Sequence, residues 1–115
     1  MTSATLAWVL ERLAKGERVA LASVVEAKGS VPGKPGARLA MSNIGGRHGT
    51  VGGAGLELKV EKHLKKMLEN GSSASRIENY VLHRDAKGKE ATALDSLCGG
   101  QVSVSLEVLD PVPHI

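Results

Sequence analysis

Residues 48–57 read HGTVGGAGLE. The segment predicts a short strand, a glycine turn, and then the first turn of a helix that continues to about Gly71. The start of a helix carries backbone N–H groups without intrahelical partners, and the aligned peptide dipoles put partial positive charge there. Because Gly52 and Gly53 carry no Cβ, an anion such as phosphate can approach these amides. The alternative is a tight strand-to-helix corner without a ligand, since glycine chiefly reports backbone geometry.

The elements on either side of this segment follow from hydrophobic periodicity. Leu39 and Arg38 fall on opposite faces of residues 37–41. Turn-forming residues separate this run from residues 48–51, so the two runs predict a β-hairpin. Residues 54–70 predict a helix whose apolar residues share one face, namely Leu56, Val60, Leu64, Met67 and Leu68.

The remaining elements complete an α+β pattern. Residues 3–15 predict an amphipathic helix, and its apolar face is formed by Leu6, Val9, Leu10 and Leu13. Residues 18–27 are apolar almost throughout, as in a central strand covered on both faces. Residues 76–83 and 101–109 predict two further strands, separated by a charged, exposed loop over residues 84–97. This order predicts a single small α+β domain, with a mixed β-sheet and two main helices packed against it.

Composition excludes several classes of protein. The 115 residues are enough for one core, the aromatic residues are Trp8 and Tyr80 alone, and the net charge is +3. Because the basic residues are scattered and no stacking platform exists, we expect no nucleic-acid binding. No apolar run approaches the roughly 20 residues of a membrane span, and residues 1–4 do not begin a signal peptide. Cys98 is the single cysteine, which excludes an intrachain disulfide, so we expect a cytoplasmic protein.

Two further glycine-containing loops adjoin the predicted strands. Residues 29–32 (GSVP) follow the central strand, and residues 98–100 (CGG) precede the last strand. Arg38 and Arg47 lie near these loops in the sequence and can supply positive charge to an anion. The alternative for each arginine is a solvated surface position. The residues alone are therefore interpreted as a small anion-binding α+β domain.

Glu57 and Cys98 are two more candidate residues. Glu57 lies in the first turn of the second helix, where it either interacts with the helix dipole or lies beside a bound ligand. Cys98 has either an approachable sulfur, which nearby arginines favour as thiolate, or a buried and inert side chain. The four histidines show no metal-ligand spacing, and His63 is expected in solvent among lysines. No catalytic constellation emerges, and we expect no metal site.

Three motifs in a fixed order resemble those of one protein family. They are residues 29–38, residues 49–57 and residues 98–100, together with the opening helix that carries Trp8 and the strand over residues 19–25. The pattern resembles the amino-terminal domain of the xanthine dehydrogenase accessory proteins, the XdhC/CoxI family. The resemblance covers nearly the whole chain, so residues 1–115 are expected to form that domain. The second, Rossmann-like domain of the family has no counterpart in them.

The resemblance implies a maturation factor rather than an enzyme. Proteins of this family bind the molybdenum cofactor (molybdopterin), support its sulfuration with a cysteine desulfurase, and pass it to the apo-enzyme of a molybdenum hydroxylase such as xanthine dehydrogenase. A glycine-rich helix start suits the phosphate of this cofactor. The cofactor contacts implied by the motifs are Gly29, Ser30, Gly36, Arg38, Gly52, Gly53, Glu57, Cys98, Gly99 and Gly100.

Two other functions are consistent with the same residues. The first is a non-catalytic interaction subunit, which pairs with a separate Rossmann-like chain or with itself, and we expect a homo-oligomer. The second is a sulfur-transfer protein that depends on Cys98.

Overall fold

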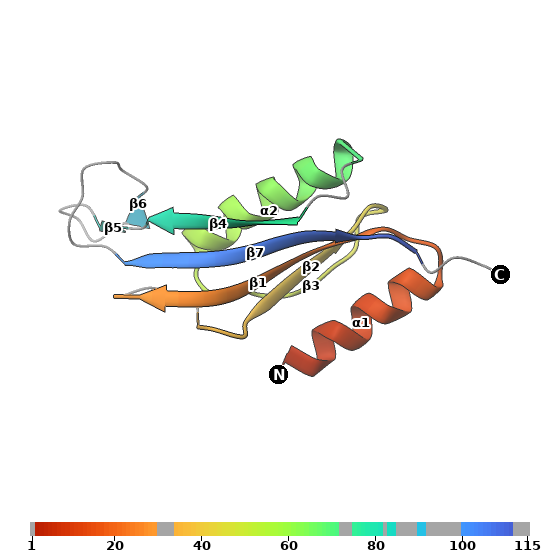
Figure 1. Ribbon diagram of the computed structural model, residues 1–115, viewed down its shortest axis with the longest axis horizontal. Coiled ribbons are helices and arrows are strands. Elements are labelled where there is room, and N and C mark those ends of the chain that lie inside the picture. The colour runs from red at the N-terminus through yellow and green to blue at the C-terminus, as the bar shows by residue number, and fades with distance from the viewer. Residues whose placement is uncertain are drawn as a thin grey trace.

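The computed structural model describes residues 2–29, 34–71, 75–81, 83–84, 90–91 and 100–111. Two helices and a main sheet make up most of this part of the chain (Figure 1). The elements in chain order are α1 (Thr2–Ala14), β1 (Val19–Lys28), β2 (Arg38–Ser42), β3 (Arg47–Gly49), α2 (Ala54–Glu69), β4 (Ser75–Val81), β5 (His83–Arg84), β6 (Glu90–Ala91) and β7 (Gln101–Leu109). The α+β class expected from the sequence is therefore confirmed.

The main sheet has five strands in the order β3-β2-β1-β7-β4. Every described strand pair is antiparallel, so the sheet is not the mixed sheet that the sequence led us to expect. The reason is the path of helix α2, which carries the chain from β3 at one edge to β4 at the other. There β4 meets β7 alone, and β7 runs in the opposite direction.

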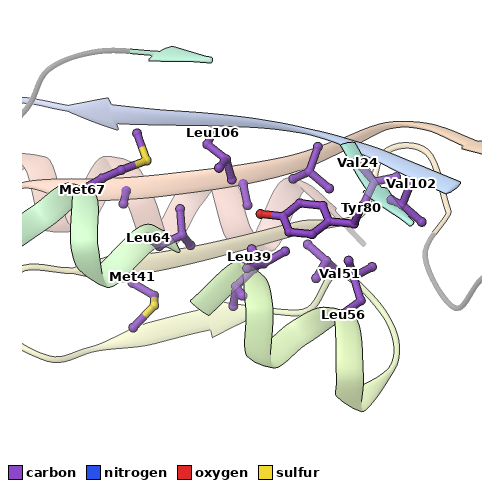
Figure 2. Close-up of a cluster of buried hydrophobic side chains, with 14 of the residues drawn as sticks. Val24, Leu39, Met41, Val51, Leu56, Leu64, Met67, Tyr80, Val102 and Leu106 are labelled. Atoms are coloured by element: carbon purple, nitrogen blue, oxygen red, sulfur yellow. The ribbon is translucent and has the colours of Figure 1, made fainter. Parts of the chain in front are cut away.

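Strand β1 is the centre of the sheet and is buried on both faces. Ala20, Ala22 and Val24 face helix α2 and belong to the larger hydrophobic cluster. Val19 and Leu21 face helix α1 and belong to the smaller one. This alternation is what an almost continuous apolar run predicts for a strand covered from both sides. Figure 2 shows the larger cluster, with the Tyr80 ring among the aliphatic side chains of the sheet and α2.

Helix α1 is rotated relative to the face that its leucines predict. Val9 and Leu13 are buried, but 39% of Leu6 and 66% of Leu10 are exposed. The other flank of the helix is held at β3, where the Trp8 ring stacks on His48 with their centroids 5.9 Å apart. This stack turns the leucine flank outward, so the prediction for Leu6 and Leu10 is wrong.

The segment between β4 and β7 was expected to be an exposed loop over residues 84–97. Instead, β5 and β6 form a short two-stranded antiparallel sheet, in which His83 pairs with Ala91 and Arg84 pairs with Glu90. The other residues of that segment lie outside the described part of the chain. Among the described residues, no helix is both long and apolar enough to cross a bilayer.

Candidate functional site

Strand β3 ends at Gly49, shortly before the glycine turn. Gly49 has a φ of +91°, and a Cβ built on it would lie 2.3 Å from the carbonyl oxygen of Arg38. A left-handed backbone and so close an approach are both open only to glycine. This residue therefore lets β3 lie directly against β2, where it pairs with Leu39.

The amides next to the turn have partners within the chain. The Val51 N–H donates to Oε1 of Glu57 at 3.1 Å, and the Thr50 hydroxyl donates to the same oxygen. The Gly52 N–H donates to Oγ1 of Thr50, also at 3.1 Å. The carboxylate of Glu57 thus fulfils at this turn a role that we had considered for a ligand's anion. Cofactor contacts at Gly52 and Gly53 stay a prediction. A cofactor that binds there would have to compete with the Glu57 carboxylate.

The charge of Arg47 is directed toward helix α2 rather than toward a loop. Its Nη2 lies 3.1 Å from Oε2 of Glu57, and its Nη1 binds Glu61. Partial burial by itself would raise the pKa of Glu57, but hydrogen bonds from Thr50 and Val51, followed by the hydrogen bond and charge of Arg47, outweigh it. The net result is a lowered pKa for this carboxyl.

We expect the Glu57→Gln variant to lose about 1–2 kcal/mol of stability at pH 7, since an amide replaces a carboxylate that accepts charged and neutral hydrogen bonds. Because the folded-state pKa of Glu57 is lowered, its contribution is complete above the unfolded-state value and is lost as the pH falls through the folded-state value. Urea denaturation from pH 7 to pH 3 should therefore show the wild type and the variant converging in acid.

The Glu69→Gln variant serves as the control for this series. It removes the same charge, and Glu69 is exposed at the end of α2. It should differ from the wild type by no more than about 0.5 kcal/mol at either pH. A constant difference between Glu57→Gln and the wild type across this pH range would contradict the role given to the Glu57 carboxylate.

An open pocket of about 360 Å³ lies beside the turn, between the start of α1, the start of β2 and the end of β3. Thr5, Arg38, His48 and Thr50 supply its polar side chains. Nδ1 of His48 lies 3.2 Å from Oγ1 of Thr5, and the Trp8 ring stacks on the imidazole, so His48 is held in place.

Arg38 is the charged residue of this pocket. It is half-buried, and its guanidinium makes no hydrogen bond or ion pair with any residue in the described part of the chain. A guanidinium offers five N–H donors in a planar fork, which matches the oxygens of a phosphate or carboxylate. Thr5 and His48 were not among the residues predicted from the sequence, although His48 directly precedes the glycine turn.

The predicted site residues that the structure describes fall at two levels along the sheet. Arg38 pairs with Ser23 in the middle of β1, whereas Lys28, which precedes Gly29, pairs with Gln101, which follows Gly100. Five residues of extended strand, roughly 17 Å, separate the two levels.

The other predicted site residues are placed as follows. Gly36 lies between the two levels, since its N–H donates to the carbonyl of Val24. Ser30, Cys98 and Gly99 lie outside the described residues, so a role for the Cys98 thiol stays a prediction. No group of three His, Cys, Asp or Glu side chains that could hold a metal ion occurs within the described ranges.

The sequence model of the XdhC and CoxI family matches residues 12–81, which include the glycine turn and Arg38. The chain belongs to this family. The resemblance read from its motifs is thereby confirmed. A search of curated proteins finds no match.

A solved structure gives a second comparison for this family member. It is similar to a protein from Bacillus halodurans described as a xanthine dehydrogenase, with 28% sequence identity and a TM-score of 0.62. The alignment covers 90% of the present chain but only 30% of the Bacillus chain. The present chain therefore spans less than a third of the length of that relative.

Proposed function

We propose that this domain is an accessory module that holds the molybdenum cofactor for a molybdenum hydroxylase such as xanthine dehydrogenase. In this proposal, the domain assists sulfuration of the cofactor or its insertion into the apo-enzyme. The cofactor itself supplies the redox chemistry of the mature enzyme, and the domain acts by binding and orienting it. The observation that carries the proposal is the half-buried Arg38, whose guanidinium has no partner among the described residues and which lines an open pocket in a domain from this family.

The pocket suits the phosphate of this cofactor better than the glycine turn does. At the turn, the Val51 and Gly52 amides already have acceptors, and the Glu57 carboxylate would repel a second anion. In the pocket, Arg38 offers a positive charge and its guanidinium N–H donors, whereas the hydroxyls of Thr5 and Thr50 are engaged with His48 and Glu57. A volume of about 360 Å³ lies at the lower end of the range for small-molecule sites. It is enough for the phosphate and the adjoining part of the pterin, with the remainder open to a partner protein.

The test uses the purified chain and molybdenum cofactor released from a molybdenum enzyme, with retained pterin and molybdenum measured after gel filtration. The wild type should bind saturably. The Arg38→Gln variant should bind at least about tenfold more weakly, because a charged hydrogen bond to phosphate contributes roughly 1.5–3 kcal/mol.

Two further variants separate the pocket from the alternatives. Lys62→Gln removes the same charge from the exposed side of α2 and should bind like the wild type. Gly53→Asp adds a carboxylate at the helix N-cap, where the extended φ of −81° accepts aspartate. A larger loss with Gly53→Asp than with Arg38→Gln would place the phosphate at the turn instead. Absence of saturable binding by the wild type would overturn the proposal.

A further inference from the structure

Strand β4 forms one edge of the main sheet. It pairs with β7 on one side, and no strand within the described part of the chain pairs with its other side (Figure 1). Two apolar side chains on it are open to solvent: 63% of Ile77 and 41% of Val81 are exposed. A free edge presents a row of backbone donors and acceptors that can pair with another strand.

The opposite edge of the sheet, strand β3, is protected from pairing with a further strand, whereas β4 is open to it. Strand β3 has only three residues, ends at Gly49 with a φ of +91°, and has α1 packed against it. Its Arg47 is held by two carboxylates of α2. In contrast, β4 extends over seven residues, SRIENYV, without proline, glycine or lysine. Of the features that prevent an edge strand from pairing, β4 therefore lacks proline, lysine and short length, and its charged residues are one arginine and one glutamate.

The sequence of β4 is complementary to itself in one antiparallel register. When Ile77 lies opposite the Ile77 of a second copy, Arg76 lies opposite Glu78 in both directions across the two-fold axis. Arg76 and Glu78 lie only 3.9 Å apart within one strand, with 50% and 34% of their side chains exposed, so both can reach a neighbouring strand. A register shifted by two residues, with the two-fold axis at Glu78, would place Glu78 opposite Glu78, which is unfavourable.

We propose that β4 pairs antiparallel with β4 of a second copy of this chain, about a two-fold axis at Ile77. The two five-stranded sheets then form one continuous sheet, and the exposed Ile77 side chains cover each other. Such an interface is isologous, as in most homodimers. The Arg38 pocket lies at the β2–β3 side of each sheet, so both pockets stay open, and the pairing is independent of cofactor binding.

Sedimentation velocity from about 1 µM to about 1 mM protein tests this pairing. The wild type should show a monomer–dimer equilibrium. Arg76→Glu and Glu78→Arg each place two like-charge pairs across the axis, so each should weaken dimerisation about tenfold or more. The double variant R76E/E78R restores opposite charges and should return to within about threefold of the wild-type constant.

Ile44→Arg is the matched control, because Ile44 is 72% exposed at the turn between β2 and β3. It should leave dimerisation unchanged. Hydrogen exchange of the wild type adds a measurement that needs no variant: the amides of β4 should become more protected as protein concentration rises. A wild type that stays monomeric, single variants that dimerise like the wild type, a double variant that stays weak, or β4 amides insensitive to concentration would each overturn the proposal.

Discussion

Replacing Gly49 with alanine is expected to lower the free energy of unfolding by about 3 kcal/mol or more. The new Cβ would lie 2.3 Å from the carbonyl oxygen of Arg38 and 2.8 Å from Oγ1 of Thr5. The first contact is with backbone, so no side-chain rotation relieves it. The left-handed φ of +91° adds a cost of about 1–2 kcal/mol for any residue with a Cβ. Urea denaturation at pH 7 measures the loss.

Gly45→Ala separates the steric clash from the backbone cost. Gly45 has a φ of +107°, but a Cβ built there meets nothing within 4 Å. The control should therefore lose only about 1–2 kcal/mol. If Gly49→Ala were no less stable than Gly45→Ala, the close approach of β3 to β2 would not be a constraint on this fold. Since Arg38 and Gly49 both line the pocket, we also expect Gly49→Ala to bind cofactor more weakly than Gly45→Ala.

The elements themselves were largely predictable from the sequence, because each has a complete local pattern. The last strand, Gln101–Leu109, has the predicted bounds, since four buried aliphatic residues alternate with polar ones. The second helix, Ala54–Glu69, ends one residue before its prediction, and all but one of its apolar-face residues are fully or almost fully buried. In both cases the hydrophobic periodicity and the flanking glycines indicated the same bounds for the element.

Features that depend on contacts between distant segments were not predictable in the same way. The rotation of α1 follows from the stack of Trp8 on His48, two residues forty positions apart. His63 was expected in solvent, but its Nδ1 lies 2.5 Å from the hydroxyl of Tyr80 on β4. Burial, with a smaller contribution from Glu78, raises the pKa of Tyr80 to about 12, so this hydroxyl stays neutral. Helical periodicity identifies the apolar side of a helix but not which neighbour each flank meets.

The candidate site depends both on local sequence patterns and on contacts between distant segments. The glycine loops were recognised from composition, and the family they indicate is confirmed. Their spacing along the sheet depends on strand order and register, which separate Gly29 and Gly100 from Arg38 by several residues of strand. The role of Glu57 was likewise open between helix dipole and ligand. The structure gives it a third role, because its carboxylate accepts hydrogen bonds from Thr50 and Val51 within the turn.

Leu56→Ala is expected to lower the free energy of unfolding by about 3–5 kcal/mol, because Leu56 is fully buried in the larger cluster at the first turn of α2. Leu58, two residues further along the same helix, is 60% exposed. Leu58→Ala makes the same change in helix propensity and removes the same atoms, so it should lie within about 0.5 kcal/mol of the wild type. The difference between these two variants in urea denaturation isolates the burial of one side chain. Similar losses for both leucines would mean that α2 does not present this face to the sheet, and the glycine turn would then lack its anchor in the core.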